Sequence, residues 1–395
     1  MPVAKPIDTA PIADWLTGGI APRATPQDVI GGFCERLVAA GVALDRFALF
    51  VRTLHPDYIG RRWMWRPGRE VEGNLGSYAE VEDPDFALSP VAVVGRTGAL
   101  FRERIDGRAE PAAPALRRLR DEGASDYVAV PLPFLDGAVH AATYATWRPG
   151  GFTEAEVAAM VALGPAVTRV AEIFALRRVV TNLLDAYVGH RSGERILAGH
   201  IRRGDTEAID AAIWLSDLRD FTAMSDGTPG EEIIARLNRH FDRVVPPIEA
   251  AGGEVLKFIG DAVLAIFPVG PGDGVAAACD AAWRAARAVC DAPPAGDDHP
   301  FRIALHAGTV LYGNIGGGSR LDFTAISPAV NLAARLSTLA GELGERLVAS
   351  AEFARHAGQS LRRRGAYELR GISGVQEVYV PSANPGSGRT GAPGT

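Results

Sequence analysis

The first part of the chain alternates helical and β-like hydrophobic patterns. Residues 26–40 carry apolar side chains at helical spacing and predict a helix. Apolar and polar residues then alternate in short runs bounded by turn residues, which is typical of strands. These runs lie at residues 45–53, 62–66, 127–133 and 137–147, and the last two flank a Leu-Asp-Gly turn. The pattern predicts a compact α/β module over residues 26–150.

A long helical pattern comes next. Thr153 precedes Glu156 by three residues at the start of this pattern, which indicates a capping box. The pattern runs to about Tyr187, although Gly164 and Pro165 interrupt it. Such a helix connects two domains, zips two chains together or packs on its own domain, and the sequence leaves these alternatives open.

Two aspartates stand at the ends of apolar runs in the C-terminal half. Asp217 closes a run that starts at residue 211 and predicts a buried strand delivering a carboxylate to its end. Asp261 lies in the tight turn of a hairpin predicted over residues 252–267. Either aspartate alone is typical of a turn residue. Together they offer two carboxylates from rigid neighbouring strands, as chemistry with two bridging metal ions requires.

A glycine-rich segment and a helix start follow. Residues 301–316 predict two strands around Gly308, and their glycines match neither a P-loop nor the Rossmann spacing, so we expect turns rather than a phosphate cradle. Pro328, preceded by a serine, predicts the first position of a helix. Asn331 and Arg335 are one turn apart on that helix, near the end that favours anions. An ordinary polar stripe is the alternative interpretation.

Composition restricts the class of protein. The chain has 395 residues, enough for two or three domains, and its net charge of −6 gives no basic field to recruit nucleic acid. Hydrophobic residues make up 47%, as in folded globular proteins. The three cysteines form no Cys-x-x-Cys pair, which argues against a zinc site or a disulfide framework.

The sequence also bears on location and on the ends of the chain. We find no secretory signal and no uninterrupted apolar run long enough to span a membrane, and we expect a cytoplasmic protein. Residues 1–25 are rich in Pro and Ala, and residues 381–395 consist mainly of Pro, Gly, Ser and Thr. Both ends are expected to be flexible and disordered.

The four C-terminal segments together resemble the catalytic domain of class III nucleotidyl cyclases, over about residues 210–380, in their order, spacing and content. The resemblance implies an α+β domain with a ferredoxin-like antiparallel sheet over residues 208–380, preceded by a helical linker over residues 151–207. In this family two Mg²⁺ or Mn²⁺ ions position a nucleoside triphosphate and activate the ribose 3′-hydroxyl. The products are a 3′,5′-cyclic nucleotide and pyrophosphate.

The resemblance also implies roles for single residues. It assigns Asp217 and Asp261 to the two metal ions, Asn331 to the ribose, and Arg335 to the charge that develops on the α-phosphate. Arg370 stands where the family usually has a lysine that contacts the terminal phosphates. The backbone N–H groups just after the first aspartate are expected to donate to phosphates, and they belong to Leu218, Arg219, Asp220 and Phe221.

Base choice rests mainly on Lys257, which corresponds to the adenine-reading lysine of adenylate cyclases and favours ATP. Where the family has Gly followed by Asp or Thr, this chain has Ser327 and Pro328. Proline offers only its carbonyl as acceptor, so we expect looser discrimination against GTP. In the family's homodimers, the metals and this lysine face Asn331 and Arg335 across a shared site. A homodimer is therefore expected, with an inactive monomer.

Residues 26–150 resemble a GAF-like sensor domain that feeds a cyclase through a helix, with a small molecule or protein as its unidentified signal. Two alternatives remain for the catalytic half: a guanylate or dual-specificity cyclase, and an inactive cyclase-like module for dimerisation or nucleotide binding. A diguanylate cyclase is disfavoured, because Val255 replaces the second acid of that family's Gly-Gly-Asp/Glu-Glu-Phe turn. That alternative would also leave Asp261, Asn331 and Arg335 unexplained.

Overall fold

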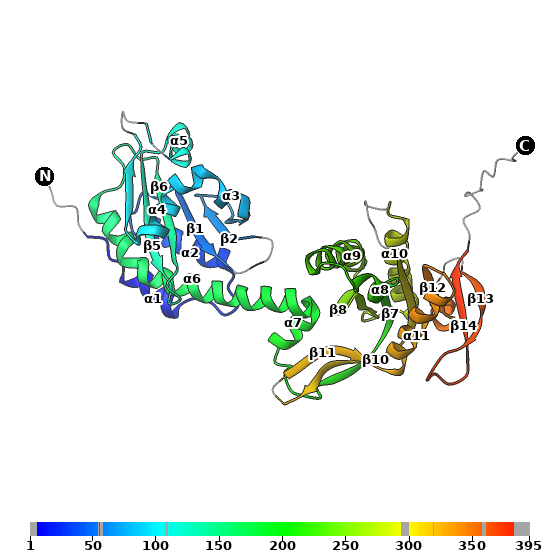
Figure 1. The fold of residues 1–395 in the computed structure, drawn as a ribbon. Coiled ribbons are helices and arrows are strands. Elements are labelled where there is room, and N and C mark those ends of the chain that lie inside the picture. Colours follow the sequence, from blue (N-terminus) through cyan, green and yellow to red (C-terminus); the bar gives the residue numbers. More distant parts are fainter. Residues whose placement is uncertain are drawn as a thin grey trace, which may run out of the picture. The chain divides into compact units, whose positions relative to one another are not determined.

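A computed structural model describes residues 6–382 apart from 54, 56–57, 107–109, 112, 294–299, 319 and 358–360. The chain divides into two compact units, Met1–Leu183 and Leu184–Thr395 (Figure 1). The division falls inside one long helix. Each unit is described by itself below.

The first unit is built on a six-stranded antiparallel sheet. In spatial order its strands are β3 (Glu72–Gly76), β2 (Gly60–Trp65), β1 (Arg46–Arg52), β6 (Val139–Thr146), β5 (Asp126–Pro133) and β4 (Phe101–Arg104). Helices cover both faces because side chains alternate along the strands. Val128 and Val130 of β5 pack towards one core, whereas Tyr127 and Ala129 pack towards the other. The hairpin predicted around the Leu-Asp-Gly turn is confirmed as β5–β6.

The helices of this unit fall into two groups. The larger core contains residues of α1 (Ala10–Gly18), α2 (Pro26–Ala39) and α6 (Glu154–Val188). The other face carries α4 (Pro90–Thr97) and α5 (Pro114–Asp121), while α3 (Tyr78–Glu82) and the 3-10 helix Pro84–Leu88 connect the strands. The expectation of a flexible segment over residues 1–25 is wrong where it can be examined. Ile12 and Leu16 of α1 are buried in the core, and residues 1–5 lie outside the described part.

Helix α6 begins with the predicted capping box. The Glu156 N–H donates to Thr153 Oγ1 at 3.3 Å, and the Thr153 N–H donates to Glu156 Oε2 at 2.7 Å. The helix continues through Pro165 to Val188, so the predicted extent is confirmed. Its length and composition would suffice to cross a membrane, but half of its most apolar window is buried within the protein, as in a core helix.

The second unit contains the ferredoxin-like core that the sequence predicts. The chain runs through β7 (Thr206–Leu218), α9 (Gly230–Ala250), β8 (Glu254–Ile259), β9 (Ala262–Pro268), α10 (Val275–Asp291) and β10 (Phe301–Gly317). These strands pair antiparallel in the order β10-β7-β9-β8. Both helices pack on one face, where Trp214 of β7 is buried against Val244 and Cys279.

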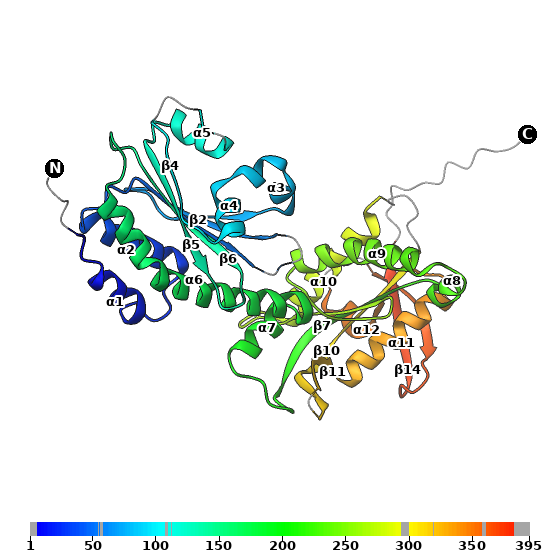
Figure 2. The same ribbon diagram turned by 60° about the vertical axis from the view of Figure 1, so that its left-hand side comes forward.

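Further elements extend this core. They are α7 (His190–Leu197), α8 (Phe221–Ser225), β11 (Arg320–Ile326), α11 (Pro328–Glu342), β12 (Leu347–Ser350), α12 (Ala351–His356), β13 (Leu361–Glu368) and β14 (Val375–Pro381). Strand β12 runs parallel to β10, so the sheet is mixed at this one pairing. Helix α11 lies along β10 and β7 (Figure 2). The disordered tail expected over residues 381–395 lies almost wholly outside the described residues.

One strand prediction needs correction. The segment around Gly308 forms a single strand, β10, and not two strands. It stays continuous because β7 pairs with it from Phe301 to Gly313. Gly308 has a packing role: a Cβ there would lie 2.9 Å from the Cβ of Ala329 on α11. The turn lies further on, after Gly317, where β10 folds back into β11.

Candidate functional site

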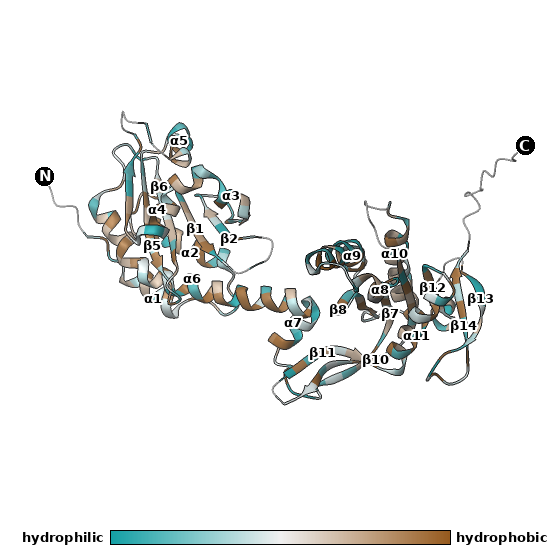
Figure 3. Ribbon diagram, viewed as in Figure 1, coloured by the Kyte–Doolittle hydropathy of each residue, from teal (hydrophilic) through white to brown (hydrophobic). Residues whose placement is uncertain are grey.

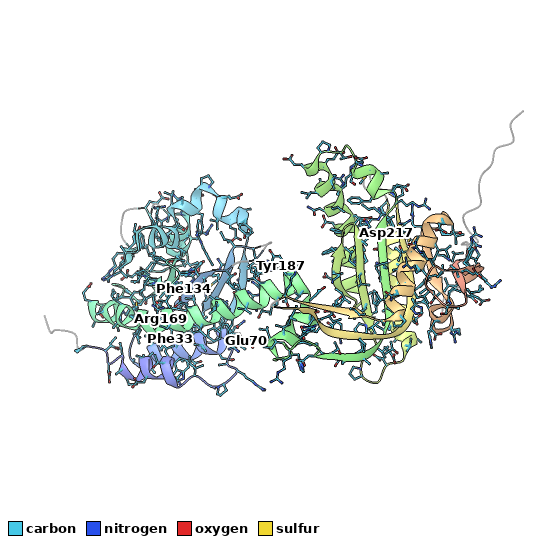
Figure 4. All side chains as sticks on the ribbon, turned by 60° about the horizontal axis from the view of Figure 1, so that its bottom comes forward. Phe33, Glu70, Phe134, Arg169, Tyr187 and Asp217 are labelled. Carbon is cyan, nitrogen blue, oxygen red and sulfur yellow. The ribbon has the colours of Figure 1, made fainter. Side chains whose placement is uncertain are left out.

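Asp217 stands next to last in β7, a central strand of the sheet, and Figure 4 labels it. Its cross-strand neighbour on β10 is Arg302, whose Nε donates to Asp217 Oδ1. Ser337 of α11 donates its hydroxyl to Asp217 Oδ2 at 3.1 Å. Burial raises the pKa of Asp217, although Arg302 and Ser337 act in the opposite direction, and nearby Asp261 raises it further. Asp217 is thus a desolvated carboxylate that a cation would stabilise.

Asp261 occupies the β8–β9 turn directly after Gly260, which has a positive φ of 63°. Glycine adopts that left-handed backbone without a Cβ clash. The Leu218 N–H donates to Asp261 Oδ2 at 3.0 Å. Since Leu218 directly follows Asp217, this bond fixes the turn beside the end of β7. The structure therefore brings together the two carboxylates that the sequence singled out.

The donor set consists of carboxylate oxygens, which suit hard divalent cations such as Mg²⁺ and Mn²⁺ better than metals that prefer nitrogen or sulfur ligands. Two aspartate carboxylates meet here, and no group of three or more His, Cys, Asp or Glu side chains forms a metal cluster among the described residues. Mg²⁺ is typically held by one or two carboxylates plus substrate phosphates and water. Each carboxylate oxygen has two lone pairs, so the present hydrogen bonds leave acceptor capacity on both side chains.

Asn331 and Arg335 lie elsewhere on α11. Both side chains are exposed, and their spacing places them on one face of the helix. Ser337, which reaches Asp217, is buried on the inward face of the same helix. Within one chain the structure does not bring Asn331 and Arg335 to the carboxylates.

Lys257 of β8 forms an ion pair with Asp322 of β11, and its side chain is 29% exposed. Pro328 is the exposed first residue of α11. The helix start predicted from Ser327 is confirmed, because its Oγ accepts from the Val330 N–H at 3.2 Å. The charged partner that the fold gives Lys257 is thus Asp322, a residue that the sequence reading did not single out.

The residues predicted to contact phosphates are Arg370 and the four backbone donors after Asp217, and the structure places them in different surroundings. Arg370 is exposed in the turn between β13 and β14, and its neighbour Leu369 packs in a cluster with α11 residues. Two of the four predicted backbone donors already have protein acceptors: Leu218 bonds Asp261, and the Arg219 N–H donates to the Pro300 carbonyl at 2.7 Å. Asp220 has a positive φ of 54° and directly precedes the short helix α8, so the N–H groups of Asp220 and Phe221 are the better candidates.

Sequence reasoning missed Arg302, Ser337 and Asp322. Arg302 opens the predicted strand 301–316 and Ser337 lies two residues after Arg335, so neither stands out locally. Their contacts with Asp217 join positions 85 and 120 residues apart. Only the register of β7 with β10 and the packing of α11 reveal them.

Comparison with known proteins identifies the family of the C-terminal half of the chain, where Asp217 and Asp261 lie. Residues 206–382 match the family described as the adenylate and guanylate cyclase catalytic domain. Residues 206–382 are a class III cyclase catalytic domain. The α+β fold expected for such a domain is confirmed, whereas this match does not extend to the first unit, so its resemblance to a GAF domain stays a prediction.

Proteins similar to this domain include adenylate cyclases and a guanylate cyclase domain. Adenylate cyclase 1 of Rhizobium meliloti (strain 1021) is 28% identical over 197 residues, which cover 47% of this chain and 29% of that protein. A bacterial light-regulated adenylyl cyclase is 26% identical at a TM-score of 0.45, covering 56% of this chain and 65% of that one. The guanylate cyclase domain of RhGC from Catenaria anguillulae is 20% identical at a TM-score of 0.39, covering 44% and 96%. The chain spans about a third of the length of the first curated relatives it matches.

Proposed function

We propose that this protein is an adenylate cyclase, a phosphorus–oxygen lyase that converts ATP to 3′,5′-cyclic AMP and pyrophosphate in cyclic-nucleotide signalling. The observation that carries the proposal is the juxtaposition of Asp217 and Asp261, fixed by the Leu218 N–H bond to Asp261. In the reaction the ribose 3′-oxygen loses its proton and bonds to the α-phosphorus. The bond from that phosphorus to the bridging oxygen breaks, and pyrophosphate leaves.

Asp217 and Asp261 would hold two Mg²⁺ or Mn²⁺ ions. Metal bound there would neutralise charge on the triphosphate and make the 3′-hydroxyl more acidic. Arg302 occupies one oxygen of Asp217 in the structure and keeps that buried carboxylate paired. Ser337 holds the other oxygen, so the carboxylate is oriented before substrate arrives.

The remaining polar residues bind the nucleotide. Arg335 stabilises the charge that develops on the α-phosphate, and Asn331 orients the ribose. Arg370 contacts the terminal phosphates through its planar guanidinium. The N–H groups of Asp220 and Phe221 donate to phosphate oxygens. Removal of a donor that acts on the transition state lowers turnover by about 10²–10³-fold.

Lys257 reads the adenine base. The ion pair with Asp322 holds the Lys257 ammonium in place. When the adenine base binds, the ammonium donates to an acceptor atom of the base, either in addition to Asp322 or in its place. Pro328 can offer the adenine base only its backbone carbonyl as a second contact. Discrimination against GTP is therefore weak, and some GTP turnover accompanies ATP turnover.

The active form is a homodimer. Asn331 and Arg335 face solvent on α11, away from the carboxylates of their own chain, so a second copy has to supply the other half of each site. Helix α6 also exposes apolar side chains at alternating spacings of three and four residues, the pattern of a two-stranded coiled coil. Figure 3 shows hydrophobic residues recurring along α6, and Figure 4 labels Tyr187 near its end. The exposed stripe consists of Ile173, Leu176, Val180, Leu183 and Tyr187.

The first unit acts as a GAF-like sensor in the cytoplasm. Its antiparallel sheet with helices on both faces provides a folded module, and α6 joins that module covalently to the cyclase domain. The signal is a small molecule or a protein. An inactive cyclase-like module is the alternative for the catalytic half. Pro328 departs from the family pattern, but the other expected catalytic positions are filled, which argues against this alternative.

The test is a product assay on the purified full chain. ATP or GTP is incubated with Mg²⁺ or Mn²⁺, and cyclic nucleotides are separated by chromatography. Cyclic AMP as the main product is expected. Cyclic GMP in equal amount would replace the proposal by a dual-specificity cyclase, and no product with either metal would favour the inactive module.

A further inference from the structure

Glu254 begins strand β8 and is only 8% exposed. Burial of a carboxylate is unfavourable unless its oxygens accept hydrogen bonds. Here Glu254 Oε1 accepts from the Ser192 N–H at 3.0 Å, from the Ser192 hydroxyl at 2.8 Å and from the Tyr312 hydroxyl at 2.9 Å. Ser192 is fully buried and Tyr312 is 3% exposed. We call Glu254, Ser192 and Tyr312 the Glu254 cluster.

The cluster joins three elements of the second unit. Ser192 lies in the first turn of α7, directly after the bend at Gly189, where φ is 85°. The carboxylate therefore caps the N-terminal end of α7 from outside, where the helix dipole favours negative charge. Tyr312 lies on β10 opposite Ala325 of β11. Burial and the Glu254 carboxylate raise the pKa of Tyr312, so its hydroxyl remains a donor.

The position of β8 explains why this cluster matters for chemistry. Among the described strands, β8 lies at the edge of the sheet and pairs only with β9, and that pairing is irregular between Val255 and Lys257. Its outer side is held by side-chain contacts at Glu254 and by the Lys257 ion pair. Lys257 lies three residues after Glu254, and Asp261 follows the end of the strand.

We propose that the Glu254 cluster positions Lys257 for its contact with the nucleotide base. Through this cluster, the position of α7 controls where Lys257 lies. The bend at Gly189 is packed close to the strand, since a Cβ there would lie 3.3 Å from the Val255 carbonyl oxygen. A displacement of the α6–α7 bend thus acts directly on β8. Glu254, Ser192 and Tyr312 touch no reacting atom and work through Lys257. This inference rests on the proposed cyclase function.

The test compares Ser192→Ala and Glu254→Gln with Glu231→Gln, a matched change at an exposed position of α9. Loss of one buried hydrogen bond changes an equilibrium constant, such as one for substrate binding, by about tenfold. We expect the KM for ATP to rise about tenfold, the ATP preference over GTP to fall, and kcat to change less than about threefold. A fall in kcat with KM and base preference unchanged would overturn the proposal.

A double-mutant cycle separates positioning from general loosening of the fold. In a Lys257→Ala background, Ser192→Ala is expected to have no additional effect on base preference. Independent, additive effects would show that the cluster does not act through Lys257. Ser192→Ala leaves the backbone donor in place, so this variant serves where Glu254→Gln fails to fold.

Hydrogen exchange of the nucleotide-free protein tests the device without catalysis. Ser192→Ala is expected to speed exchange of the amides of residues 256–259 on β8, and Glu231→Gln is not. Faster exchange confined to α7 would overturn the inference. If the wild-type protein makes no cyclic nucleotide, the proposed function fails on that result, and the exchange experiment decides the coupling of α7 to β8 by itself.

Discussion

Arg302 offers a quantitative test of how the site handles its buried charge. The ion pair with Asp217 is largely shielded, since the Arg302 and Asp217 side chains are 23% and 17% exposed. Exposed pairs contribute about 0–1 kcal/mol, and breaking a fully buried pair costs about 3–5 kcal/mol. We therefore expect Arg302→Ala to destabilise the metal-free protein by about 2 kcal/mol. For a unit of this size the corresponding fall in Tm is about 4–8 °C.

Metal should restore much of this loss. With Arg302 removed, a divalent cation is the remaining positive charge for Asp217, and binding at a hundred times its Kd stabilises by about 2.7 kcal/mol. Thermal melts in EDTA and in saturating Mn²⁺ measure the difference between wild type and Arg302→Ala. We expect the gap in Tm to narrow to less than half in Mn²⁺, with Arg302→Lys close to wild type. An equal gap under both conditions would refute the idea that Arg302 and the metal share Asp217.

Three further predictions concern the rest of the molecule. Asp217→Asn and Asp261→Asn should abolish metal-dependent turnover and leave the circular dichroism spectrum unchanged. Mixing the Asp261→Asn protein with the Arg335→Ala protein should restore activity, because a mixed dimer contains one intact site. If activity does not recover, the site is not shared between two chains. Burial lowers the pKa of His306 to about 4, below its ordinary 6.5, so only the unfolded state takes up a proton readily as the pH falls from 6.5 to 4. Unfolding in urea should therefore show that up to about 3 kcal/mol of stability is lost over this pH range. A His306→Gln variant should lack this loss. Burial raises the pKa of Cys279 to about 12, so iodoacetamide should label this thiol only after unfolding, and rapid labelling of the native protein would count against its burial.

Local signals carried much of the prediction. The capping box at Thr153, the turn at Asp261 and the helix start at Ser327 all formed where the sequence placed them. Each depends on hydrogen bonds or backbone preferences within a few residues, so neighbouring residues suffice to specify them. Misjudged segments depended on distant partners. Residues 10–18 are helical and packed because α2 and α6 supply a core, and β10 runs straight through Gly308 because β7 pairs with it.

Short motifs in a fixed order were enough to identify the class of the catalytic domain and its two carboxylates. The groups that surround these carboxylates are seen only in the folded chain. Arg302 meets Asp217 across two strands, and Ser192 meets Glu254 between a helix and an edge strand 62 residues further along. Tertiary structure also placed Asn331 and Arg335 on an outward helix face. Such contacts follow from strand register and helix packing, which no local pattern of residues encodes.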